Sequence, residues 1–159
     1  MRNRKLALIL IAAILFDMAC VCTGTTSLSP ATPTPPAPPG ASQANPSGII
    51  SKLVLAKDVQ GDQMEPVNPT NVFAPADTIH AVVAIENAPG NTSFKAIWYA
   101  VDVGSSSRNQ EIDSTDLASE GTRNLDFSLS PNEKWPAGKY KVEIYVNGNL
   151  DQVVQFSVK

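Results

Sequence analysis

The sequence predicts an all-β domain, a single seven-stranded antiparallel β-sandwich that follows a disordered N-terminal tether. Three observations predict this class. Apolar and polar residues alternate with a period of two in several segments after residue 48, as expected of half-buried strands. Turn-forming residues separate these segments at short intervals. The same region contains no convincing helical periodicity, so the segments are expected to form a sandwich.

The first nineteen residues have the pattern of a secretion signal. Arg2, Arg4 and Lys5 form a basic start, and the run from Leu6 to Phe16 is entirely apolar. A run of this length is too short for a membrane-spanning helix, which needs ~20 residues. It fits the apolar region of a signal peptide. Residues 1–19 are therefore interpreted as a signal peptide, and the mature chain is expected outside the cytoplasm.

The residues around Cys20 resemble the lipobox of bacterial lipoproteins. Ala19 and Cys20 match the small residue and the cysteine that becomes lipidated, and Met18 is compatible, whereas Asp17 stands where the family prefers an apolar residue. The resemblance implies that Cys20 carries a lipid that anchors the protein to a membrane of the cell envelope. Two alternatives remain open: ordinary cleavage nearby, for example after Gly24, and an uncleaved N-terminal anchor.

Residues 20–47 are expected to be a tether between this anchor and the domain. Seven of the thirteen prolines of the chain fall between Thr23 and Ser47, with Thr, Ser, Ala and Gly around them. Such a composition cannot bury a core. Cys20 and Cys22 are the two cysteines of the chain. The domain, residues 48–159, therefore has no disulfide, and its stability must come from burial.

The first half of the domain contains three predicted strands. Residues 49–57 alternate, and the turn-rich residues 58–75 follow them. In residues 78–86 both faces are rather apolar, which suggests that the outer face is partly covered. A turn is expected at residues 87–91, which include Pro89 and Gly90. Residues 92–103 are apolar on both sides, which is typical of a central strand.

The second half contains four more. Residues 109–120 fit either an edge strand around residues 111–115 or one helical turn that begins at Ser114 or Thr115, and Gly121 would end either. Residues 125–129 alternate cleanly. The last two strands, residues 140–146 and 150–158, flank Asn147-Gly148-Asn149, which favours a tight hairpin turn. A hairpin alone is not stable in water, so the rest of the chain must complete the sheet.

The domain resembles immunoglobulin-like and fibronectin type III-like sandwiches. The resemblance rests on the strand order, on Trp98 in the third strand and on the segment Gly138 to Ile144 that opens the sixth. Tyr140 occupies the place of the tyrosine-corner residue of these families, which implies that its hydroxyl bonds back to the main chain. The inter-sheet cysteine pair of antibody domains is absent. The resemblance implies binding or spacing as the usual role.

The sequence offers no arrangement typical of catalysis or of metal binding. His80 is the single histidine and is expected to be an exposed or lightly covered surface residue. The acidic residues Glu111, Asp113, Asp116 and Glu120 lack the spacing of a calcium loop and are expected to be a solvated edge that discourages pairing with other strands. We therefore predict a non-enzymatic protein without a cofactor.

The net charge and the exposed aromatic residues indicate which class of partner the domain could bind. Without its signal the chain carries 9 Lys and Arg against 14 Asp and Glu, a net charge near −5, which argues against nucleic acid as a partner. Trp135 in a connection, and Tyr99 and Tyr145 on the outer phase of their strands, are the candidate ligand-binding residues. Aromatic side chains in such places stack on sugars or dock proteins.

Two classes of function follow from this sequence. In the first, the domain is a binding or adhesion module of the envelope that recognises a protein or a carbohydrate. In the second, it is a structural or accessory envelope component without a free ligand. In the second case Trp135 caps the open end of the core, and Tyr99 packs on its outer-face neighbours. The domain is expected to be monomeric in both.

Overall fold

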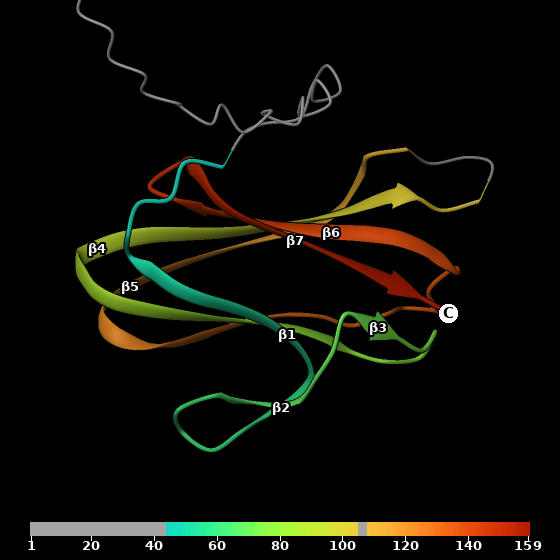
Figure 1. The fold of residues 1–159 in the computed structure, drawn as a ribbon, viewed down its shortest axis with the longest axis horizontal. Helices are drawn as coiled ribbons and strands as arrows, with labels where there is room; N and C mark the ends of the chain where they lie inside the picture. Colours follow the sequence, from blue (N-terminus) through green and yellow to red (C-terminus); the bar gives the residue numbers. More distant parts are fainter. Residues whose placement is uncertain (1–43, 105–107) are drawn as a thin grey trace, which may run out of the picture. The chain divides into compact units, whose positions relative to one another are not determined.

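Seven strands form one hydrogen-bonded sheet that curls until its two halves face each other across the core (Figure 1). The computed structural model describes residues 44–104 and 108–159. The strands are β1 (Ile50–Gln60), β2 (Glu65–Pro69), β3 (Val72–Phe73), β4 (Ile79–Asp102), β5 (Gln110–Leu129), β6 (Gly138–Val146) and β7 (Asn149–Val158). Within the described ranges no helix is long and apolar enough to cross a membrane.

The strand β4 belongs to both halves of the sheet. Its first part, up to Ile85, pairs with β1, and its second part, from Phe94, pairs with β6. Between them the backbone bends at Asn87 and Asn91, which have φ angles of 50° and 60°. Asparagine tolerates this left-handed region better than most residues. The sequence predicts a turn between two strands here, but the chain bends without ending the strand.

The strand β5 follows β4 around the same bend. Residues 123–129 pair with the first part of β4, and residues 110–119 pair with the second part. At the bend Gly121 has a φ angle of 76°, which glycine adopts without steric cost. The strand interpretation of residues 109–120 is therefore confirmed and the helical one is wrong. Gly121 bends the strand and does not end it.

The other side of the curled sheet is closed by β2 and β3. β2 pairs with β1 in antiparallel fashion, and β3 pairs with β7 in parallel, with Val72 opposite Ser157. Thr70 N donates to Leu55 O at 2.9 Å, and Lys159 N donates to Phe73 O at 3.0 Å. The short segment that carries β2 and β3 thus links the two halves. The remaining opening lies between the two halves of β5.

The predicted antiparallel immunoglobulin-like sandwich is therefore wrong, although the all-β class is correct. The sheet is mixed, because β3 and β7 are parallel, and its two halves are continuous through β4 and β5. Residues 58–75, predicted as turns, contain two strands. These strands were not predicted, because β2 contains two prolines and β3 has two residues, so neither shows an alternation of apolar and polar residues.

The core between the two halves is rich in aromatic residues. Trp98 and Phe94 have no exposed surface, and Phe127 is 1% exposed. Phe156 stacks on Tyr140 with ring centroids 5.4 Å apart and makes an edge contact with Trp98 at 6.0 Å. The core positions predicted for Trp98, Tyr140, Phe127 and Phe156 are confirmed. The Tyr140 hydroxyl donates to Pro136 O at 2.6 Å, so the predicted bond back to the main chain is present.

The outer face of β1 and of the first part of β4 is covered, as its apolar composition predicts. Ala56 is fully buried and Val82 is 3% exposed, although both point away from the main core. The hairpin between β1 and β2 folds towards β5 on this side, where Asn124 Nδ2 donates to Gln63 O at 2.8 Å. This bond and the buried valine hold the hairpin against the sheet.

The chain enters the domain beside the hairpin that joins β6 to β7. Asn45 N donates to Leu150 O at 2.9 Å, and Ser47 N donates to Asp151 Oδ2 at 2.5 Å. Asp151 is 1% exposed. Residues 45 and 47, which precede the predicted boundary at residue 48, are therefore hydrogen-bonded to the domain. Trp135 precedes the first residue of β6 and so lies at the opposite end of that strand.

Replacing Trp98 by alanine should lower the free energy of unfolding by roughly 3–5 kcal/mol, the usual cost of removing a buried large aromatic ring. Chemical denaturation of residues 44–159 measures this change. Trp98→Phe is the matched variant. The indole Nε1 has no hydrogen-bond partner among the described residues, so phenylalanine removes no bond and should cost less than alanine.

Val72→Ala provides the surface control, because this side chain is 46% exposed. Its effect should stay within about 0.5 kcal/mol. Equal losses for Trp98→Ala and Val72→Ala would contradict the placement of the indole in the centre of the core.

Candidate binding surfaces

Trp135 is held at the end of the core rather than displayed in full. Its backbone N donates to Pro75 O at 2.8 Å, and its indole Nε1 donates to Asp77 O at 2.9 Å. The ring makes an edge contact with Tyr140 at 6.2 Å and packs against the core while remaining half-buried. The packing expected of a residue that caps the core is therefore present. A fixed, partly exposed ring is also a good platform for a ligand, because little side-chain entropy is lost on binding.

Two hollows flank Trp135. One has a volume of about 490 Å³ and is lined by Trp135 together with the start of β5 and residues 128–136. The second, of about 350 Å³, lies between Trp135, Tyr140 and the ends of β4 and β5. Ile112 lines both and is 38% exposed. An exposed isoleucine beside a fixed indole forms a small apolar patch with polar neighbours, including Asp113, Glu133 and Lys134.

Tyr99 and Tyr145 lie together on the outer face of β4 and β6, as their strand phase predicts. They surround Glu143, which is only 6% exposed although it points outward. The Tyr145 hydroxyl donates to Glu143 Oε2 at 2.8 Å, and Lys141 Nζ donates to Glu143 Oε1 at 2.7 Å. The same ammonium lies 4.6 Å from the centre of the Tyr99 ring. These four side chains, which we call the tyrosine cluster, form one connected surface.

The polar groups of the tyrosine cluster interact with one another, and burial together with these interactions shifts the pKa values of both phenols. Burial, followed by the hydrogen bond and charge of Glu143, raises the pKa of Tyr145 to about 12. Burial, and next the charges of Glu143 and Glu111, also raises the pKa of Tyr99. Both phenols therefore stay neutral at physiological pH. Because Glu143 already has two partners, the cluster offers a ligand mainly the flat surfaces of its rings.

The structure does not bring the three predicted aromatic residues into one site. Trp135 lies at the end of the core, and the two tyrosines lie on the outer face of the sheet. The sequence indicated correctly that Tyr99 and Tyr145 share a face. Glu143 at the centre of the cluster was not foreseen, since a charged residue in the outward phase of a strand is normally interpreted as solvated.

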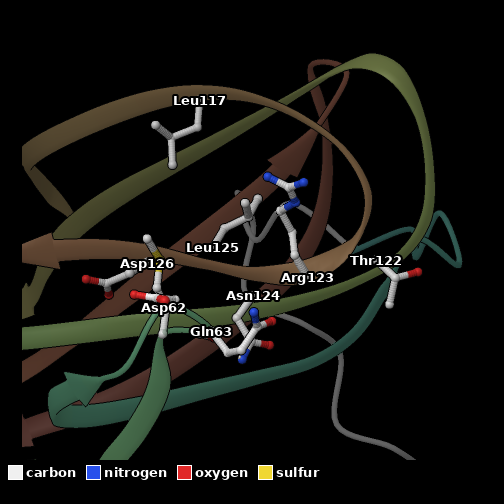
Figure 2. A pocket seen from close by; sticks show the side chains of 9 residues that line it. Asp62, Gln63, Leu117, Thr122, Arg123, Asn124, Leu125 and Asp126 are labelled. Carbon is white, nitrogen blue, oxygen red and sulfur yellow. Dashed lines mark hydrogen bonds between the residues drawn. The ribbon is translucent and has the colours of Figure 1, made fainter.

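A further hollow, of about 520 Å³, lies where β5 bends (Figure 2). Leu117 and Leu125 come from the two halves of β5, and Arg123 extends its guanidinium group into the space between them. Asp62, Gln63 and Met64 of the hairpin between β1 and β2 complete the lining. Sequence reasoning missed this hollow, because its walls come from segments that are about sixty residues apart.

His80 is not exposed, and of the two surface positions predicted for it the covered one is observed. Its side chain is 14% exposed, and Nδ1 lies 2.9 Å from Asp126 Oδ2. Asp126 also lines the hollow at the bend of β5. Within the part of the chain that the structure describes, no group of three or more His, Cys, Asp or Glu side chains is placed to hold a metal ion. Cys20, the predicted lipidation site, lies outside the described residues.

Comparisons with known proteins add little to this geometry. No protein-family model matches the chain, and no curated protein matches it. Among solved structures, Pseudomonas fluorescens alkylpurine DNA glycosylase AlkC, bound to DNA that contains an abasic site analog, is similar with a TM-score of 0.41 and 15% identity. The match covers 56% of this chain and 27% of the glycosylase, so this chain corresponds to about a quarter of that protein.

The prediction that nucleic acid is not a partner is corrected, because this similar structure was determined with DNA bound. The exclusion is therefore withdrawn. A TM-score of 0.41 carries no argument for DNA binding, or for glycosylase activity, in this chain.

The raised pKa of Tyr145 predicts a loss of stability in strong base. The phenol has a pKa near 10 when unfolded and about 12 when folded, so its contribution is complete below pH 10 and is lost as the pH rises through 12. Denaturation curves between pH 9 and pH 12 should show this loss. Tyr145→Phe should reduce it, because phenylalanine cannot ionise.

Absorbance titration of the phenolate provides the direct measurement. Glu143→Gln should lower the pKa of Tyr145 while leaving it above 10, because burial remains when the carboxylate is removed. A Tyr145 that titrates at its ordinary pKa in the folded protein would contradict the packing of the tyrosine cluster.

Proposed function

We propose that this protein is a lipid-anchored component of the cell envelope whose β-domain is a non-catalytic module that binds a protein or a carbohydrate. The observation that supports this role is Trp135 with its two hollows. The indole is fixed by a hydrogen bond and by core packing, Ile112 beside it is exposed, and the hollows of about 490 and 350 Å³ give space for a ligand.

The direction of the chain also supports binding at this end. Asn45 and Ser47 bring the chain to the β6–β7 end of the domain, while Trp135 lies at the opposite end of β6. A ligand at the Trp135 end would therefore leave residues 45–47, through which the chain joins the domain, uncovered.

The second candidate, a structural component without a free ligand, is favoured by a different observation. All three aromatic candidates have partners within the domain. Trp135 Nε1 donates to Asp77 O, the Tyr145 hydroxyl donates to Glu143, and Lys141 Nζ lies 4.6 Å from the centre of the Tyr99 ring. Side chains satisfied in this way need no ligand. An experiment must therefore distinguish the two roles.

Lipid anchoring is tested by metabolic labelling with a palmitate analogue. The wild-type protein should carry the label and sediment with membranes. Cys20→Ala should lose the label and appear in the soluble fraction, whereas Cys22→Ala should behave as the wild type. Equal behaviour of wild type and Cys20→Ala would mean ordinary cleavage or a retained N-terminal helix.

Binding at the Trp135 end is tested by a photo-reactive amino acid placed at Ile112 in the full chain in its native cells. Irradiation should give one discrete adduct, to a protein or to a glycan. The same amino acid at Val153, which is 37% exposed on the outer face of β7, is the matched control and should give none. Absence of an adduct at both positions would favour the structural role.

A further inference from the structure

The opening between the two halves of β5 has the features of a docking site for a strand. We propose that the edge of β5 from Asp113 to Leu117 binds a basic, extended segment of a partner protein as an added antiparallel or parallel strand. This inference rests on the proposed binding role and specifies the chemistry of the partner. Addition of a strand to a free edge is a common mode of peptide recognition, in which main-chain hydrogen bonds supply affinity and side-chain pockets supply specificity.

The edge of β5 has no strand beside it. In the part of the chain that the structure describes, β5 pairs with β4 and with no other strand. Such an edge presents a row of backbone N–H and C=O groups that can pair with another chain. It runs through both halves of the sheet, because β5 bends together with β4.

The register identifies the outward-facing backbone groups. Asn147 N donates to Ser93 O, so Ser93 directs its backbone groups to β6 and the next residue, Phe94, directs its own to β5. Phe94 lies opposite Leu117, so Leu117 directs its backbone groups to β4. Backbone direction alternates along a strand, and Asp116 and Ser114, one and three residues earlier, therefore direct their N–H and C=O groups away from β4. A side-chain bond agrees with this: Ser114 N donates to the carboxylate of its neighbour Asp113 at 2.9 Å.

A hollow lies at each end of this edge. Ile112 and Asp113 line the one beside Trp135, and Leu117 lines the one at the bend, opposite Leu125. Side chains of an added strand alternate between its two faces. Those on the inner face would enter the gap between the halves of β5, where Leu117, Leu125 and Leu129 supply apolar contacts among polar lining residues.

The negative charge along this edge favours a basic partner strand. Glu111, Asp113 and Asp116 are exposed along this edge. Among the described residues, Lys95 Nζ lies 3.4 Å from Asp116 Oδ2, and the Asp116 side chain is 64% exposed. An exposed pair of this kind contributes little. A second copy of the domain would place the same carboxylates against one another, which is unfavourable. A basic strand would place opposite charges there. Asp116 lies opposite Lys95 and Glu111 opposite Tyr99, on the outer face, whereas Asp113 lies opposite Trp98 on the inner face. Arg123 at the bend is positively charged, so the lysines of an added strand are needed on the outer face, beside Glu111 and Asp116.

The test measures binding of a fluorescent nine-residue peptide that alternates lysine and valine to the detergent-solubilised full-length protein, by fluorescence anisotropy. The wild type should bind, and added salt should weaken the binding. The same peptide N-methylated at alternate residues keeps its charge but cannot pair with a strand edge. It should bind at least tenfold more weakly.

Variants of β5 locate the site. Ser114→Pro removes one outward N–H and leaves the pairing with β4 intact, as proline at an edge allows, so it should weaken binding at least tenfold. Ser114→Ala, which keeps the N–H, is its control. Glu111→Gln with Asp116→Asn should also weaken binding, because these carboxylates lie on the outer face of the edge, whereas Glu65→Gln with Glu86→Gln, which removes exposed acids elsewhere, should not.

Several results overturn the proposal. These are no binding by the wild type, equal binding of the N-methylated peptide, or equal effects of the β5 variants and their controls. A concentration-dependent dimer that Ser114→Pro abolishes would assign the edge to a second copy instead. If Ser114→Pro fails to fold, the difference in wild-type binding between the plain and the N-methylated peptide still tests strand addition. If these tests fail but photo-crosslinking at Ile112 gives a discrete adduct, strand addition is wrong and the proposed binding role is still supported.

Discussion

The long antiparallel pairing between β4 and β5 is the constraint on which the rest of the domain depends. The two strands bend together, so one continuous ribbon contributes to both halves of the sheet and fixes their separation. The inward residues of β4 on both sides of the bend, Ile79 to Ile85 and Phe94 to Ala100, then face each other across a single core. Trp98 fills its centre and contacts Phe156 of the last strand. Without the ribbon, the first and last strands would have no common core.

The same ribbon creates the opening. Because β4 is paired on both sides, β5 must lie at the edge in both halves of the sheet, and the two edges face one another. The β2–β3 segment spans the opposite side, where a hollow of about 350 Å³ remains between β1, residues 69–71 and Val154 of β7. The hollows of about 490 and 520 Å³ lie along this opening, and their walls are completed by the connection after β5 and by the hairpin between β1 and β2. This is the reason for locating recognition along β5 and beside Trp135 rather than on the flat outer face.

Hydrogen bonds of polar side chains hold the ends and the outer surface of this sheet. Asp151, almost fully buried, accepts from Ser47 N and holds the entering chain beside β7. Glu143 connects Lys141 and Tyr145 on the outer face, and Tyr140 bonds to Pro136 where the last connection joins β6. A buried charge costs free energy unless it is paired and hydrogen-bonded. Glu143 has both an ion pair and hydrogen bonds, whereas Asp151 accepts one bond through Oδ2 and its Oδ1 has no partner among the described residues.

The sequence by itself determined the all-β class, the core positions of Trp98, Phe127, Tyr140 and Phe156, the C-terminal hairpin and the shared face of Tyr99 and Tyr145. Those features depend on the period-two alternation and on local turn residues, which sequence displays directly. Tertiary structure alone decided that β4 and β5 continue through Asn87, Asn91 and Gly121, since a positive φ angle fits a bend as well as a turn. It also decided the parallel pairing of β3 with β7, the burial of Glu143 and the hollow around Arg123. These depend on contacts between distant segments, and no local pattern encodes which strand a given edge will meet.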